Sequence, residues 1–164
     1  MNNAHKPAIN IGMLGLGTVG TGVAKVLTAN AHSIAQKVGA PVVLKKVLVR
    51  DLGKPRKVDL GDALTTDLSA IVDDPSIDIV VELMGGEEPA KSHILRALAA
   101  GKHVVTANKD VIARHGRDLF AAAEANAVDL LFEASVGGGI PIIRPLKQCL
   151  AGNRICQVMG IVNG

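Results

Sequence analysis

A glycine-rich segment near the start of the chain constrains the fold more than any other feature. Residues 9–14 form an apolar run that leads directly into the hexapeptide GLGTVG at residues 15–20. Apolar residues then recur at helical spacing as far as Leu27. A strand, a glycine turn and a helix in this order are the context in which a GxGxxG pattern indicates a dinucleotide-binding site.

Each glycine of the hexapeptide has an expected task. Gly15 lets the chain turn sharply, Gly17 leaves room for a pyrophosphate, and Gly20 lets the helix pack closely on the strand. We expect the phosphates to lie on the free N–H groups of a helix that begins near Thr18. The alternative is a purely structural turn, which the surrounding strand and helix pattern disfavours. The predicted cofactor contacts of this turn are Gly15, Leu16, Gly17, Thr18, Val19 and Gly20.

The rest of the chain alternates strand and helix patterns. The expected strands are residues 9–14, 42–50, 77–84, 103–106 and 128–133, and helical patterns lie between them, including a short one within 61–74. The chain is 48% apolar but only 1% aromatic, so aliphatic side chains must build the core. Both features are typical of buried parallel strands. The predicted fold class is α/β, a Rossmann-type, doubly wound and mainly parallel sheet with helices on both faces.

Composition excludes several other classes of protein. A net charge of +3 is too small to indicate a nucleic-acid surface, and two Phe with no Tyr or Trp offer no platform for stacking bases. The N-terminus lacks the apolar core of a signal peptide, and no stretch approaches the roughly 18 apolar residues of a membrane span. We therefore expect a cytoplasmic enzyme that binds neither nucleic acid nor membrane.

Cysteine and histidine give no sign of a transition-metal site. Cys149 and Cys156 form no CxxC motif and lie in apolar segments, so we expect reduced, buried thiols. The five histidines show no HxxxH spacing and no pairing with a carboxylate, and ordinary surface roles are expected for them.

Ligands of doubly wound sheets bind beyond the carboxyl ends of the strands. We expect five loops to meet there, and they comprise residues 16–19, Arg50, 84–86, 106–109 and 133–139. Gly85, Thr106 and Asn108 are predicted cofactor contacts within this set. Lys109 is the only basic side chain at a strand end other than Arg50, and a lysine at the start of a helix is disfavoured by the helix dipole. Its position therefore favours a functional role.

The residue at the end of the second strand indicates which cofactor is used. Most proteins of this fold place an acidic residue there for the adenosine ribose, whereas this chain has Arg50 followed by Asp51. A guanidinium can bind a 2′-phosphate through two parallel hydrogen bonds. This favours NADP(H), with NAD(H) also possible. In the alternative interpretation, Arg50 belongs to a solvated basic loop and Asp51 binds the ribose.

The last thirty residues depart from a simple nucleotide domain. Residues 135–141 form a second glycine turn, Pro141 is expected to begin a helix, and residues 154–162 are expected to form another strand. The chain then ends at the turn dipeptide Asn163-Gly164, so we expect the natural protein to continue. We divide the chain into a dinucleotide-binding domain at 1–135 and the start of a second domain at 136–164.

Five motifs together resemble the homoserine dehydrogenase family. They are GLGTVGTGV at 15–23, VELMGG at 81–86, TANKD at 106–110, EASVGGGIPII at 133–143 and GIVNG at 160–164. The TANK motif followed by EASVGGGIP is the specific part of the match. The resemblance covers the N-terminal, nucleotide-binding part of that family, and the substrate and dimerisation region would begin about where this chain ends.

The resemblance implies reversible hydride transfer between NAD(P)H and L-aspartate 4-semialdehyde, which gives L-homoserine on the way to threonine, methionine and isoleucine. The full-length protein is expected to be a homodimer. Lys109 would be the catalytic residue present in this chain, either polarising the carbonyl or binding the nicotinamide ribose. Because nothing here holds the amino-acid end of the substrate, we expect this chain to bind cofactor weakly and to be inactive alone.

Glu133 matches a monovalent-cation site of the same family. Its carboxylate and the backbone carbonyls of Val136, Gly138 and Ile140 are hard oxygen ligands suited to sodium or potassium. In the alternative interpretation, Glu133 faces solvent and the glycines only turn the chain. Spacing alone does not decide between the two interpretations, and the resemblance favours the cation site.

Two other functions share parts of this pattern. An aspartate dehydrogenase-like enzyme would keep the fold and change the substrate, although the TANK and SVGGG motifs argue against it. A stand-alone NADP(H)-binding module that senses redox state would bind the cofactor without turnover.

Overall fold

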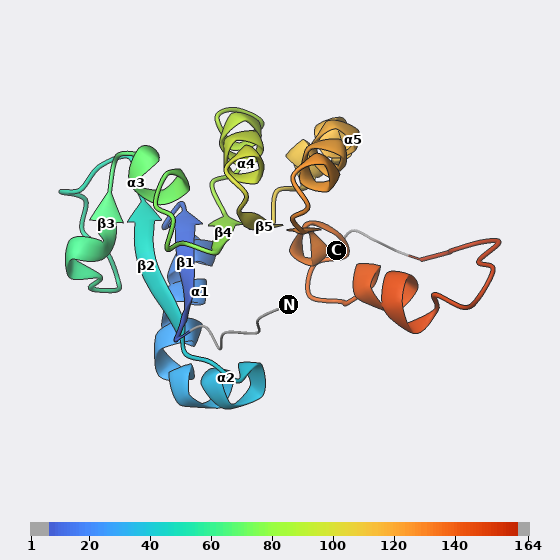
Figure 1. Cartoon of the computed structure of the whole chain (residues 1–164), viewed down its shortest axis with the longest axis horizontal. Helices are drawn as coiled ribbons and strands as arrows, with labels where there is room; N and C mark the ends of the chain where they lie inside the picture. Colours follow the sequence, from blue (N-terminus) through green and yellow to red (C-terminus); the bar gives the residue numbers. More distant parts are fainter. Residues whose placement is uncertain (1–6, 161–164) are drawn as a thin grey trace.

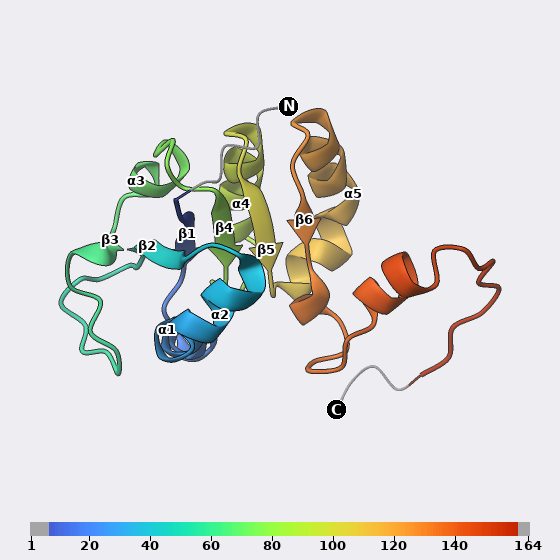
Figure 2. The same cartoon turned by 60° about the horizontal axis from the view of Figure 1, so that its bottom comes forward.

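The computed structural model describes residues 7–160, so the N-terminal residues 1–6 and the expected turn at Asn163-Gly164 lie outside it. Residues 7–160 form one six-stranded sheet with the order β3-β2-β1-β4-β5-β6, and every neighbouring pair is parallel (Figure 2). The strands are β1 (Ile9–Leu14), β2 (Val42–Leu48), β3 (Leu64–Thr65), β4 (Ile79–Glu82), β5 (His103–Thr106) and β6 (Leu130–Leu131). This strand order is that of the Rossmann fold.

Helices cover both faces of the sheet, as predicted. One face carries α1 (Thr18–Ala29) with α2 (Ala31–Val38) beside it, and the other carries α3 (Ser69–Val72), α4 (Ala90–Ala99) and α5 (Lys109–Ala125) (Figures 1 and 2). Short helical segments occur at η1 (Gly61–Ala63), η2 (Glu133–Ser135) and η3 (Pro145–Cys149).

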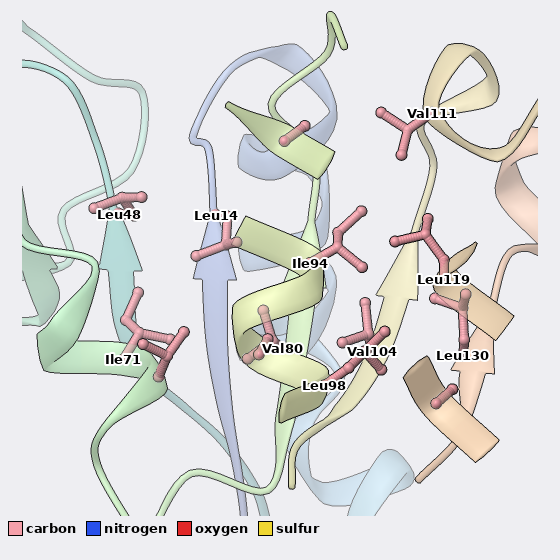
Figure 3. Close-up of a cluster of buried hydrophobic side chains, with 14 of the residues drawn as sticks. Leu14, Leu48, Ile71, Val80, Ile94, Leu98, Val104, Val111, Leu119 and Leu130 are labelled. Carbon is pink, nitrogen blue, oxygen red and sulfur yellow. The ribbon is translucent and has the colours of Figure 1, made fainter. Parts of the chain in front are cut away.

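Side chains that alternate along the central strands fill two cores. Leu14 of β1 and Val80 of β4 pack under α4 and α5 with Ile94 and Leu98, as Figure 3 shows. Met13, the neighbour of Leu14 in β1, points to the opposite face and packs toward α1. Adjacent strand residues thus serve opposite faces, which is why the strands are apolar almost throughout.

The register of the sheet aligns the carboxyl ends of four strands. Leu14 pairs with Leu48 on one side and with Glu82 on the other, and Glu82 pairs with Thr106. The loops that follow these residues therefore leave the sheet at the same edge, side by side. The predicted site residues that follow β1, β2, β4 and β5 lie at this edge.

Several expectations at the level of elements were wrong. Residues 154–160 form no strand, and residues 161–162 of the expected strand lie outside the described range. The helical turn expected from Pro141 is formed later, at η3, and the expected helix within 61–74 is divided among η1, β3 and α3. Cys149 and Cys156 are exposed free thiols, because the segments that carry them run away from the sheet (Figure 2).

Among residues 7–160, no helix has the length and apolar character that crossing a membrane requires.

Candidate functional site at the carboxyl ends of the strands

Gly15 makes the sharp turn out of β1. Its φ of 100° lies in the left-handed region, and its N–H donates to the carbonyl of Leu48 (N···O 3.0 Å). A Cβ at this position would lie 2.9 Å from the carbonyl oxygen of Leu83. Both the dihedral angle and the close neighbour require glycine, as the sequence pattern predicts.

Gly17 and Gly20 differ in what surrounds them. A Cβ on Gly20 would lie closer than 3.0 Å to the carbonyl oxygen of Gly15, so glycine at this position lets α1 pack against the turn. A Cβ on Gly17 would meet no protein atom within 4 Å. The open space beside Gly17 is where the sequence predicts the pyrophosphate, so the geometry of the turn fits this group.

The N-terminus of α1 is suited to an anion. Gly17 is its N-cap residue and provides no side chain to cap the first turn, and that turn contains no acidic residue. The first N–H groups of a helix lack intrahelical partners and carry the positive end of the dipole. Thr18 and Val19 are exposed, so these groups are open to a ligand.

Arg50 differs from the other basic residues of its loop. The guanidinium of Arg56 donates to the carbonyls of Asp51, Leu52 and Lys54 and so holds the loop together. Arg50 is exposed and makes no ion pair or side-chain hydrogen bond within residues 7–160. It follows β2 directly, beside the turn at Gly15, so its guanidinium is available to a ligand there.

Asp51, the alternative ribose ligand, is partly engaged. Its Oδ1 accepts a hydrogen bond from the N–H of Gly53 (2.8 Å), which forms a tight local turn. The other oxygen, Oδ2, accepts no hydrogen bond from residues 7–160, so the structure leaves both Arg50 and Asp51 able to face the adenosine end.

The loops after β4 and β5 are tied to each other. Gly85 and Gly86 both have positive φ, at 75° and 74°. The side chain of Asn108 donates from Nδ2 to the carbonyl of Gly86 (2.7 Å), and its Oδ1 caps α5 by accepting from the N–H of Val111 (3.2 Å). Lys109, the next residue, is exposed and its ammonium has no partner in the described part of the chain.

Glu82 was not predicted as a site residue. It is 0% exposed, and its carboxylate accepts from the N–H of Met84 (2.7 Å) and from the hydroxyl of Thr106 (2.6 Å). Carboxylates are rarely buried to this degree unless both oxygens have donors. The sequence signal was an acidic residue near the carboxyl end of the run IDIVVELM, where apolar residues surround Glu82 on both sides.

Glu133 lies at the start of η2 and organises the second glycine turn. Its two oxygens accept from the N–H groups of Ile142 (2.5 Å), Ile143 (2.9 Å) and Arg144 (2.8 Å). Desolvation raises the pKa of Glu133, but these three hydrogen bonds outweigh it and the pKa is lowered overall. Gly137 and Gly138 have positive φ.

The carbonyl oxygens predicted as cation ligands remain free of protein donors. Those of Val136, Gly138 and Ile140 accept no hydrogen bond from residues 7–160. An ionised carboxylate has about four lone-pair sites, so Glu133 retains acceptor capacity beyond its three backbone donors. Carboxylate and carbonyl oxygens are hard donors, the type that sodium and potassium prefer. No group of three or more His, Cys, Asp or Glu side chains within residues 7–160 is arranged to hold a metal.

Two histidines pair with carboxylates, contrary to expectation. His115 on α5 lies 2.6 Å from an oxygen of Glu87, and Arg114 binds the other oxygen at 2.9 Å. The hydrogen bond with His115 is the largest cause of a lowered pKa at Glu87. His103 lies 3.3 Å from Asp129. Glu87 therefore ties the loop after β4 to α5, a role that adjacency in sequence did not reveal.

Two shallow hollows occur outside this edge. One of about 400 Å³ lies between α1 and the segment 58–60, and one of about 270 Å³ lies over the basic loop that contains Lys54 and Arg56. Neither includes the glycine turn, which is an open surface at the N-terminus of α1.

A parallel sheet in this order, with a glycine turn between β1 and α1, defines a dinucleotide-binding domain of the Rossmann type. The sequence pattern of the family described as "Homoserine dehydrogenase, NAD binding domain" matches residues 15–133. The chain belongs to this family.

Individual relatives agree with the family. The homoserine dehydrogenase of Bacillus subtilis is 51% identical over 158 residues, which cover 96% of this chain. A crystal structure of a homoserine dehydrogenase from Thiobacillus denitrificans has 50% identity and a TM-score of 0.84, and it covers 90% of this chain and 34% of its own. A hyperthermophilic archaeal homoserine dehydrogenase, solved in complex with NADPH, has 25% identity and a TM-score of 0.70 over 85% of this chain and 48% of its own.

The chain spans about a third of the length of the curated relatives it matches, for example 36% of the Bacillus subtilis protein. The comparisons therefore concern the nucleotide-binding part of those proteins.

Proposed function

We propose that this chain is the cofactor-binding part of a homoserine dehydrogenase, which reversibly reduces L-aspartate 4-semialdehyde to L-homoserine with NADP(H). The reaction serves threonine, methionine and isoleucine biosynthesis, in the cytoplasm. The observation that carries the proposal is the glycine turn, where Gly17 faces open space and the first N–H groups of α1 have no acidic neighbour. The name of the relatives, homoserine dehydrogenase, supports homoserine as a substrate, and the archaeal relative bound to NADPH supports the cofactor.

Different residues of the chain bind different parts of the cofactor. The N–H groups at 17–20 hold the diphosphate, with Leu16 and Val19 beside them, and Arg50 binds the 2′-phosphate of the adenosine half. Gly85 lines the nicotinamide half. Thr106 and Asn108 were predicted as direct contacts, but these residues are buried, at 0% and 5% exposure, so they hold the loops that leave β4 and β5 beside the nicotinamide. When bound, the reduced nicotinamide supplies the hydride that turns the aldehyde carbon into that of an alcohol.

Lys109 has the position for the catalytic role in this part of the protein. It is the first residue of α5, held next to the buried cap Asn108, and its ammonium is exposed and unpaired within the described residues. An ammonium at this point stabilises the negative charge that develops on the substrate oxygen during reduction. Alternatively it binds the nicotinamide ribose, and both roles place it beside the reacting groups.

We also propose a sodium or potassium site at the turn after η2. The proposed ligands are the Glu133 carboxylate and the free carbonyls of Val136, Gly138 and Ile140, which are hard oxygen donors. The ion would fix the turn that leads out of the nucleotide-binding domain.

Residues 1–135 form the NAD(P)-binding domain in this proposal, and residues 136–164 begin a substrate and dimerisation domain. The full-length protein is a homodimer, and the residues that hold the amino-acid end of the substrate lie in the rest of it. The 164-residue chain alone therefore binds cofactor without turnover.

Calorimetric titration of the chain with NADPH and NADH tests the cofactor assignment, and loss of NADPH absorbance on adding aspartate 4-semialdehyde tests the reaction. We expect binding, with NADPH preferred, no turnover by the chain alone, and turnover by the full-length protein. Absence of binding to either dinucleotide would refute the cofactor assignment. Homoserine oxidation by the isolated chain would refute the proposal that the substrate-binding residues lie in the rest of the protein. NADPH binding without turnover by the full-length protein would indicate a sensing module.

A further inference from the structure

We propose that Glu82 is a positioning residue for the nicotinamide half of the cofactor site. The inference rests on the proposed function, because it concerns how the loops of that site are held. Glu82 ends β4, and it is the only acidic residue among the fully buried side chains of the described range. It lies beneath two loops that carry predicted cofactor contacts.

The carboxylate joins the ends of two strands. Its Oε1 accepts from the N–H of Met84, the residue immediately before Gly85, at 2.7 Å. Its Oε2 accepts from the hydroxyl of Thr106, at the end of β5, at 2.6 Å. Each oxygen therefore fixes a different loop, and both are fixed relative to the rigid sheet.

Thr106 extends the connection to α5. Because its single hydroxyl proton goes to Glu82, the oxygen is left as an acceptor for the N–H of Asn108, which lies 3.0 Å away. Asn108 then binds the carbonyl of Gly86 at 2.7 Å and caps α5. One chain of hydrogen bonds thus runs from Met84 through Glu82 and Thr106 to the residue before Lys109.

These hydrogen bonds require a side chain at position 82 that accepts hydrogen bonds and donates none. An amide at position 82 would place an NH2 against either the N–H of Met84 or the hydroxyl of Thr106, and in both orientations one buried donor loses its partner. The loops would then relax without any change in the residues that touch the cofactor. Glu82→Gln keeps the size and shape of the side chain, removes its negative charge and replaces one acceptor oxygen with a donor NH2 group.

The position of Glu82 beside the glycine turn extends its influence. A Cβ on Gly15 would meet the carbonyl of Leu83 and the Cα of Met84, so the segment that follows Glu82 is one wall of the turn at Gly15. Displacement of Met84 therefore affects both the turn that holds the diphosphate and the loop at Gly85.

The test compares Glu82→Gln, Thr106→Val and Thr106→Ser in NADPH titrations of the 164-residue chain, together with amide hydrogen exchange. Glu82→Gln and Thr106→Val should each weaken NADPH binding about tenfold, equivalent to about 1.4 kcal/mol, and the double variant should lose little more than either alone. Thr106→Ser keeps the hydroxyl and should bind within about twofold of the original chain. The amides of Met84 and Asn108 should exchange faster in the first two variants.

Val80→Ala is the matched control, since it weakens the core of the same strand without touching the hydrogen-bond chain. It should lower the unfolding midpoint at least as much as Glu82→Gln and leave NADPH binding unchanged. The positioning role would be overturned if Glu82→Gln bound NADPH as tightly as the original chain. It would also be overturned if Val80→Ala lost as much NADPH affinity as Glu82→Gln. If the original chain binds neither NADPH nor NADH, the proposed function itself fails, and this inference fails with it.

Discussion

Replacing Gly20 with alanine tests the geometry of the glycine turn directly. The new Cβ would lie closer than 3.0 Å to the carbonyl oxygen of Gly15, and this neighbour is backbone, which cannot rotate away as a side chain can. The turn or the first turn of α1 must therefore shift. Gly22, two residues further along the same helix, is exposed, and a Cβ there would meet nothing within 4 Å.

The comparison of Gly20→Ala with Gly22→Ala isolates the clash. Alanine gains about 1 kcal/mol of helix propensity over glycine at an interior position, and both variants share this gain approximately. Forcing an extra methyl group into a packed site costs about 1 to 3 kcal/mol. Gly22→Ala should therefore stabilise the chain slightly, and Gly20→Ala should be less stable than Gly22→Ala by about 1 to 3 kcal/mol.

Urea unfolding followed by circular dichroism measures this difference, with the dependence on denaturant expected to stay constant across the variants. NADPH titration of the same samples should show weaker binding for Gly20→Ala alone, since its turn has moved. If Gly20→Ala is as stable as Gly22→Ala and binds NADPH equally well, the close approach of α1 to the turn is not the reason for glycine at this position.

Three further changes have distinct expected outcomes. Gly17→Ala should lower stability by at most about 1 kcal/mol, because alanine is a poorer N-cap residue than glycine. It should nevertheless weaken the binding of both NADPH and NADH in calorimetric titration, because the new Cβ fills the open space beside the turn. Unchanged binding would contradict the phosphate assignment. Arg50→Ala should weaken the binding of NADP(H) by about 1 to 3 kcal/mol and that of NAD(H) much less. Equal losses for the two cofactors would show that Arg50 does not bind the 2′-phosphate. Hydrogen bonds from Lys45 and Ser76 hold the pKa of Asp74 well below its ordinary value, so its stabilising contribution is complete above a pH of about 5 and is lost as the pH falls below about 4. Asp74→Asn should flatten the fall in unfolding midpoint between pH 6 and pH 3, and an equally steep fall in the variant would show that Asp74 does not cause it.

The sequence predicted the parts of the fold that local patterns control. The glycine turn followed from three spaced glycines: Gly15 makes the sharp turn and Gly20 allows α1 to pack closely, as predicted, and Gly17 faces open space. The long apolar strands and the helices between them likewise predicted a parallel sheet with both faces covered. Each of these features is set by residues close together in the chain.

Features that depend on distant neighbours were missed or wrong. A two-residue strand such as β3 has no periodicity to detect, and the apolar run at 154–160 has no strand beside it in the described structure. The pairing of His115 with Glu87 joins residues 28 positions apart, and the Glu82 bond to Thr106 spans 24. Only the packed sheet brings such partners together, so adjacency in sequence cannot reveal them.

Chemical-shift changes of backbone amides during titration with NADPH test the central claim most directly, because they report on the N–H groups proposed to hold the diphosphate. The largest changes should fall on Gly17, Thr18, Val19 and Gly20, with smaller ones at Gly85 and Lys109. A saturating titration that leaves the four amides of the turn unchanged, or shifts only amides elsewhere, would contradict it.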